Sequence, residues 1–180
     1  ETDDDFSLFN TTTGVFRPSL TFPVSENGSL GLFYDASYDE MSDYRGTSGV
    51  LRSEVAQKEL WSSALGYRYT YDTRRTGLDP DSGVLLSLEQ EYAGLGGDTE
   101  FIKTTARFVA QTRVLNDEVT LRATVEGGAL DFQGSKNSRA IDRFTTQVMR
   151  GFEPNGMGPI EGNEHLGGDY FAVAKFEAEF

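Results

Sequence analysis

A turn-rich stretch near the end of the chain places an arginine beside a glycine and an aromatic residue. Its members are Met149, Arg150, Gly151, Phe152, Gly158 and Pro159. The guanidinium of Arg150 is a planar fork that can bind a carboxylate through two hydrogen bonds. Gly151 permits a close backbone approach, and Phe152 supplies an apolar anchor. We therefore predict that Arg150 docks on an acidic wall; the alternative is a solvated loop arginine, whose ion pairs would contribute little.

Other residue types that could do chemistry are sparse. The chain has no cysteine and one histidine, His165, so we expect no thiolate or histidine metal site and no catalytic triad. Glu89 and Glu91 lie two apart in a strand pattern, which predicts two carboxylates lining one face rather than an acid–base pair. Acidic runs near the N-terminus and in turns could bind calcium only weakly. We expect no enzyme activity, no cofactor and no resident metal.

Composition narrows the class of protein further. The 180 residues carry a net charge of −13, which argues against nucleic acid as a partner. The 13 Phe and 8 Tyr argue against disorder for most of the chain. No apolar run approaches the length of a membrane helix, but a membrane β-barrel shows only short segments of alternating polarity.

Seven segments alternate between apolar and polar residues and are predicted to be strands. They are residues 14–22, 30–39, 61–72, 84–93, 102–114, 118–130 and 169–180. Residues 1–13 and 94–100 are interpreted as loops, 54–60 as a short helix, and 131–168 as a long irregular insert. The links between strands are expected to be alternately short and long. Period-two alternation with such links predicts an antiparallel meander.

The polar faces of these segments favour a hydrated interior over a packed core. They carry charges of both signs, whereas the apolar faces are modest and rich in Ala, Thr and Tyr. We therefore predict an all-β fold, an antiparallel transmembrane β-barrel. The alternative from pattern alone is a soluble β-sandwich or barrel, such as a domain that binds calcium or carbohydrate.

The stretch around Arg150 also resembles a known signature. Met149 to Phe152, then Gly158-Pro159, then a Gly-Gly pair at 167–168 opening a strand, is similar to the sixth external loop of the BamA family of outer-membrane assembly factors. Met149 stands where that family has Val or Ile. Residues 71–83 and 20–30 resemble two further turns of the family, so the resemblance covers about residues 14–180.

The resemblance implies a fragment of about seven consecutive strands, six to twelve, of a roughly 16-stranded barrel. Residues 131–168 would be a long external loop folded into the lumen. The closing strands and the periplasmic POTRA domains would be absent from residues 1–180. Glu177, on the strand after the loop, matches the family's acidic position and is the implied wall partner of Arg150.

The resemblance also implies a function and a location. The protein would fold and insert outer-membrane proteins in the outer membrane of Gram-negative bacteria. It would contact the lipid bilayer and lipopolysaccharide, unfolded outer-membrane proteins, and the accessory lipoproteins of the assembly complex. The alternatives are a two-partner secretion or translocation-and-assembly transporter, which shares the signature, and a passive porin or structural barrel.

Overall fold

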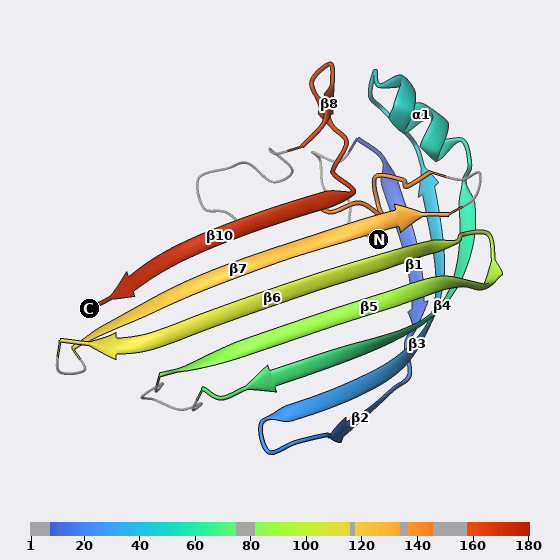
Figure 1. Ribbon diagram of the computed structural model, residues 1–180. Helices are drawn as coiled ribbons and strands as arrows, with labels where there is room; N and C mark the ends of the chain where they lie inside the picture. The colour runs from blue at the N-terminus through green and yellow to red at the C-terminus, as the bar shows by residue number, and fades with distance from the viewer. Residues whose placement is uncertain (1–7, 75–81, 116–117, 134–136, 146–157) are drawn as a thin grey trace.

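Residues 8–74, 82–115, 118–133, 137–145 and 158–180 are described by the computed structural model (Figure 1). They form one short helix, α1 (Gly49–Val55), and ten strands. The strands are β1 (Asn10–Phe16), β2 (Ser19–Pro23), β3 (Gly28–Ser42), β4 (Glu59–Asp72), β5 (Gly83–Gly97), β6 (Phe101–Val114), β7 (Val119–Phe132), β8 (Ile160–Glu161), β9 (Glu164–His165) and β10 (Tyr170–Glu179).

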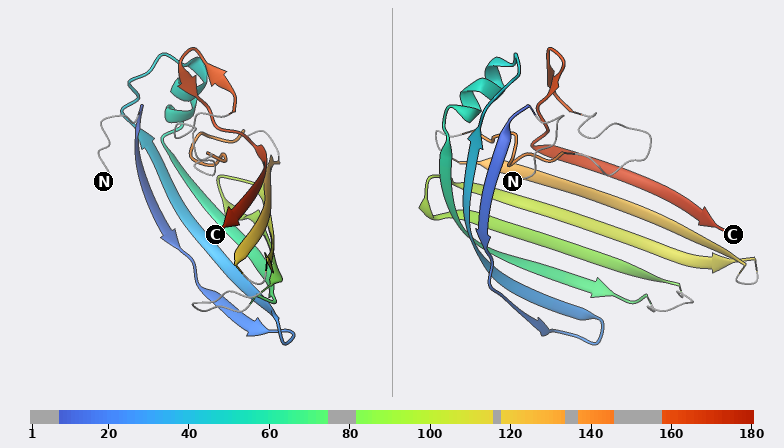
Figure 2. Two further views of the ribbon diagram at one scale, coloured as in Figure 1. Left: turned by 90° about the vertical axis from the view of Figure 1, so that its left-hand side faces the viewer. Right: turned by 180° about the vertical axis from the view of Figure 1, so that it is seen from behind.

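The main sheet is antiparallel throughout and runs in the order β1-β3-β4-β5-β6-β7-β10, with β2 also paired to β3. It curves into a half-barrel, and β8 and β9 form a separate hairpin (Figures 1 and 2). We call the end of the sheet that carries α1 and this hairpin the loop end, and the opposite end the turn end. The predicted all-β antiparallel barrel fragment is confirmed.

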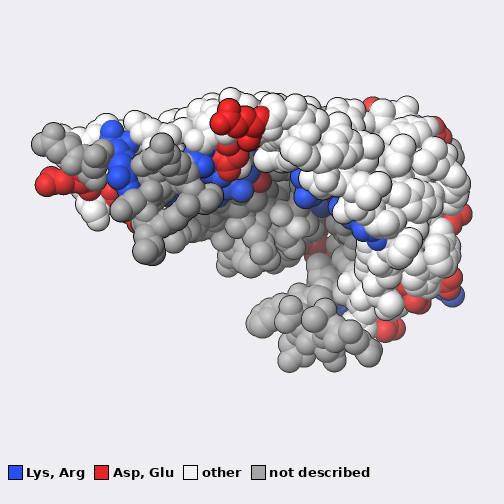
Figure 3. All heavy atoms as spheres, turned by 90° about the horizontal axis from the view of Figure 1, so that it is seen from below, with Lys and Arg blue, Asp and Glu red and all other residues white. Residues whose placement is uncertain are grey.

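The two faces of the curved sheet differ in polarity as the alternation predicts. Large apolar side chains are exposed on the outer face: Phe16, Leu20, Leu32, Trp61, Leu65, Phe108, Val125, Tyr170 and Phe176. Charged side chains gather on the inner face: Arg17, Asp35, Arg68, Glu89, Glu91, Lys103, Arg107, Arg122, Glu126, Lys175 and Glu177. In Figure 3 the convex side is mainly white, and blue and red atoms lie on the hollow side. An apolar convex face and a charged concave face are typical of a barrel with a wet lumen.

The first predicted strand is divided in two at a proline. β1 and β2 both pair with β3, but Arg17 and Pro18 between them leave the ladder. Proline has no N–H to donate, so it interrupts strand pairing, although the Pro18 carbonyl still accepts from the Tyr34 N–H at 3.1 Å. The prediction that residues 1–13 are a loop is wrong for 10–13, which lie in β1.

The predicted helix at residues 54–60 is misplaced. α1 begins after Ser48, whose hydroxyl caps it by accepting the Leu51 N–H at 3.1 Å. It ends at Val55, and β4 already begins at Glu59. Leu51 and Met41 are both 1% exposed, so the apolar side of α1 is buried against the end of β3. Among the described residues, no helix has the length and apolar character needed to span a membrane.

The predicted alternation of short and long links fails between β5 and β6. β5 continues to Gly97, which leaves only residues 98–100 before β6, although 94–100 was expected to be a loop. Gly94, Gly96 and Gly97 have φ values of 142°, 124° and 101°, conformations that only glycine adopts easily. They let the strand continue through the register shift that lies opposite Ser62 to Ala64 of β4.

Candidate functional site

The segment before the predicted motif returns to the inner face of the sheet. The ring of Phe144 packs at a tilt of 57° against that of Phe171 of β10, with centroids 4.8 Å apart. It also covers Gly128 of β7, where a Cβ atom would lie 2.7 Å from the Phe144 ring. The Lys103 ammonium of β6 lies 5.2 Å from the ring centroid. One phenyl ring thus contacts three neighbouring strands from the inside.

The segment after the motif closes on the segment before it. Phe144 and Gly168 exchange two backbone hydrogen bonds, of 2.9 and 3.1 Å. The Leu166 N–H donates to the Pro159 carbonyl at 2.9 Å, and Gly158 lies beside Gly167. Gly158 and Gly167 have φ values of 116° and 75°, which favour glycine at both turns. Gly158, Pro159 and the Gly-Gly pair, separate in the sequence, are therefore neighbours in space.

Met149, Arg150, Gly151 and Phe152 lie outside the described residues. The docking of Arg150 therefore stays a prediction. The described residues on both sides of it, 137–145 and 158–168, belong to the insert predicted at 131–168.

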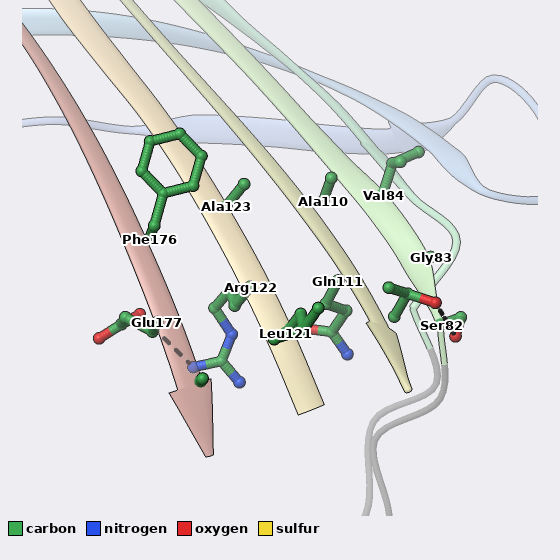
Figure 4. Close-up of a pocket in the computed structure, with 12 residues that line it drawn as sticks. Ser82, Gly83, Val84, Ala110, Gln111, Leu121, Arg122, Ala123, Phe176 and Glu177 are labelled. Atoms are coloured by element: carbon green, nitrogen blue, oxygen red, sulfur yellow. Dashed lines mark hydrogen bonds and ion pairs between the residues drawn. The ribbon is translucent and has the colours of Figure 1, made fainter. Parts of the chain in front are cut away.

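Glu177 lies on the face predicted for it, the inner face of β10 that also bears Phe171. It stands opposite Arg122 of β7, with a carboxylate–guanidinium distance of 3.9 Å, and its side chain is 58% exposed. Figure 4 shows this pair at the turn end of the sheet, beside a groove of about 610 Å³. An exposed carboxylate held by one long contact can accept a second guanidinium.

The β8–β9 hairpin is attached to the loop that precedes α1. The Glu164 carboxylate accepts the Thr47 N–H at 2.5 Å, the Tyr44 hydroxyl at 2.5 Å and the Ser48 N–H at 3.3 Å. These bonds, the Thr47 amide first, lower the pKa of the Glu164 carboxyl to about 2. A Cβ atom at Gly46 would lie 2.5 Å from this carboxylate, so a larger residue there would have to displace the Glu164 side chain.

A second carboxylate of the hairpin reaches the first turn of α1. Glu161 accepts hydrogen bonds from the Ser48 hydroxyl and from the Val50 N–H, the latter at 3.1 Å. The Ser48 bond, followed by that from Val50, lowers the pKa of the Glu161 carboxyl. Negative side chains are favourable at a helix N-terminus. The hairpin therefore completes the capping of α1.

A buried ion pair joins the other end of α1 to the insert. Arg143 and Glu54 form an ion pair with side chains 9% and 7% exposed. Arg143 also donates to the Leu166 carbonyl at 2.6 Å and to the Ser138 carbonyl at 2.7 Å. Glu54 accepts the Ala140 N–H at 2.8 Å. Sequence reasoning missed this pair, because nothing in the local pattern links positions 54 and 143.

A charge network on the inner face was also not predicted as a unit. Arg17 binds Asp35 of β3 at 2.5 Å and Glu91 of β5 at 2.9 Å, and its guanidinium lies 4.5 Å from the Phe33 ring centroid. The Phe33 ring lies over Gly66 of β4, where any Cβ atom would overlap it. The glycine in an otherwise regular strand was the available signal, since it marks a close approach.

The family model and the relatives found by comparison with known proteins agree with one another. A model of the Omp85 superfamily domain matches residues 1–180. The outer membrane protein assembly factor BamA of Neorickettsia risticii is 25% identical over 164 residues, 89% of this chain and 22% of that protein. The sorting and assembly machinery component 50 homolog of Xenopus tropicalis is 32% identical over 169 residues, 92% of this chain and 35% of that protein. The chain thus spans between about a fifth and a third of these relatives.

Proposed function

The chain belongs to the Omp85 superfamily, and on this premise we propose that it is part of a barrel that folds and inserts β-barrel proteins into an outer membrane. Relatives from bacteria and from animals carry names of assembly factors or assembly machinery. The apolar outer face and the charged inner face support a wall between lipid and a wet lumen. The proposed role involves no covalent chemistry, catalytic residue or cofactor.

The observation that carries the proposal is the return of the insert to the inner wall at Phe144. Arg150 follows Phe144 by six residues, and Glu177 follows the Phe144 partner Phe171 by six residues. Six residues of extended chain cover about 20 Å. An extended chain running from Phe144 toward the turn end therefore has the length to bring Arg150 to Glu177, and we propose that this contact braces the barrel from within.

The finer assignments follow the family signature. We propose the bacterial outer membrane as the location, with its lipids and lipopolysaccharide around the wall. Unfolded outer-membrane proteins would be the substrates, and accessory lipoproteins the partners in the assembly complex. The mitochondrial outer membrane is the competing location, because the SAM50 homologues match at 31–35% identity.

Replacement of Arg150 by Ala in the full-length protein tests the proposal. A charge-assisted, two-pronged hydrogen bond contributes about 1.5–3 kcal/mol, so Arg150→Ala is expected to lower barrel stability and the yield of assembled outer-membrane proteins. Heat-modifiable gel mobility reports barrel stability. The yield of assembled outer-membrane proteins is measured in cells that are depleted of the native protein and carry the variant as the sole copy. The matched control is Arg52→Ala, on the exposed side of α1. Unchanged mobility and assembly in Arg150→Ala would contradict the proposal and favour a passive barrel.

A further inference from the structure

Two consecutive residues of the insert contact different elements. Arg143 reaches Glu54 of α1, at the loop end of the sheet, and Phe144 reaches Gly128 and Phe171 on the inner wall. The dipeptide therefore joins the helix at the loop end to the inner wall.

The hydrogen bonds of Arg143 hold its guanidinium in one orientation. Its guanidinium donates to Glu54, to the Leu166 carbonyl, to the Ser138 carbonyl and, at 3.1 Å, to the Ser138 hydroxyl. These partners come from α1 and from both described halves of the insert. A planar fork with five donors fixes such a set of acceptors, whereas a lysine ammonium would not.

The Phe144 side is equally constrained. Gly128 leaves space for the ring, and Phe171 packs against it at a tilt. The Lys103 ammonium lies over the ring and also donates to the Asp142 carbonyl at 3.4 Å. The Phe144 backbone is paired with Gly168, immediately before β10. Phe144 thus places its ring on the inner wall and, through its backbone, pairs the two described halves of the insert.

We propose that Arg143 and Phe144 are positioning residues that couple α1 to the inner wall, so that helix and wall together set where the insert enters the lumen. The geometric coupling stands without the proposed function, and its role in presenting Arg150 rests on that function. Glu54 belongs to the same device, because it is the α1 partner of Arg143.

Amide hydrogen exchange on the full-length protein tests the coupling through effects across the dipeptide. The Ala140 N–H bonds Glu54 on the helix side, and the Gly168 N–H bonds the Phe144 carbonyl on the wall side. We expect Glu54→Gln to speed exchange at Gly168, and Phe144→Ala to speed exchange at Ala140, each by about tenfold. A merely local role predicts faster exchange on the altered side only.

Two control variants change exposed residues on α1 and on β10, one removing a charge and the other a phenyl ring. Arg52→Gln changes the exposed side of α1, and Phe176→Ala removes a phenyl ring from the outer face of β10, where it is 82% exposed. Both are expected to leave Ala140 and Gly168 unchanged. If Phe144→Ala does not yield a heat-modifiable barrel, Phe144→Leu carries the same test.

The inference is overturned if Glu54→Gln and Phe144→Ala each affect only their own side. The exchange readout does not involve assembly activity. A failure of Arg150→Ala to impair assembly would therefore remove the proposed function and leave this coupling standing.

Discussion

Arg17 reaches across two strands by extending over the Phe33 ring, which occupies the space that Gly66 leaves open. Its partners Asp35 and Glu91 belong to β3 and β5, and the ring of Phe33 fills the space above Gly66 between them. Arg17 also lies 3.8 Å from Glu89, whose carboxylate binds Arg68 of β4 at 2.6 Å. A single guanidinium thereby compensates several carboxylates at the point where Pro18 interrupts the first strand.

Replacement of Arg17 by Met should remove the ion pairs that Asp35 and Glu91 make with it on the inner face. Their side chains are 9% and 12% exposed, but that of Arg17 is 39% exposed, so solvent screens part of the loss. We expect the free energy of unfolding to fall by about 1–3 kcal/mol, measured by urea titration of the folded barrel. Arg107→Met, which removes an exposed 4.0 Å contact to Glu126, should cost about 0–1 kcal/mol. Equal losses in the two variants would contradict the assigned role of Arg17.

For single residues, the sequence predicts the face of the sheet on which a side chain lies better than it predicts the residues that the side chain binds. Period-two alternation placed Arg17, Asp35, Glu91 and Glu177 on the polar face. The register confirms that Asp35, Glu91 and Glu177 share the inner side, and the ion pairs of Arg17 with Asp35 and Glu91 place it there too. It did not predict that Arg17 binds Asp35 and Glu91, because that contact depends on the break at Pro18 and on the missing side chain at Gly66.

Among the elements, α1 and the β8–β9 hairpin depend on one another. The hairpin supplies Glu161 and Glu164 to the first turn of α1 and to the loop before it. The helix position could not be predicted from local propensity, because its N-terminal capping includes carboxylates more than a hundred residues away. The strands were predicted well because their signal is local alternation. The exceptions are the first strand, which begins at Asn10 and is divided at Pro18, and β5, which its glycines extend.

Acid should release the hairpin from the loop before α1. The pKa of Glu164 is about 2 in the folded protein, below the ordinary 4.5, so its stabilising contribution is complete above pH 4.5 and is lost as the pH falls toward 2. We expect protection of the Thr47 and Ser48 amides from hydrogen exchange to decline across this window. In Glu164→Gln, protection should be low at pH 7 with no such decline.

Glu118→Gln, an exposed carboxylate at the turn end, is the matched control and should retain the wild-type profile at Thr47 and Ser48. Protection in the Glu164→Gln variant equal to that of the wild type at pH 7 would show that Glu164 does not hold the hairpin.

In the molecule as a whole, the curved sheet forms the wall, and the insert joins the helix at its loop end to its inner face. The fold class, the two faces and the positions of Gly158, Pro159 and Glu177 follow from the sequence pattern and the family resemblance. The anchoring of the insert through Arg143 and Phe144 does not, because ion pairs and ring contacts between distant segments leave no periodic trace in the chain.

The central claim, that Arg150 braces the barrel against Glu177, is tested most directly by a double-mutant cycle in the full-length protein. The variants are Arg150→Ala, Glu177→Gln and both together, with unfolding read by urea titration and Arg122→Gln as the control for the 3.9 Å pair with Glu177. If the two side chains bind each other, each single change lowers the free energy of unfolding. The double variant is then at least as stable as the less stable of the two single variants. Additive losses, or no loss in Glu177→Gln, would contradict the account.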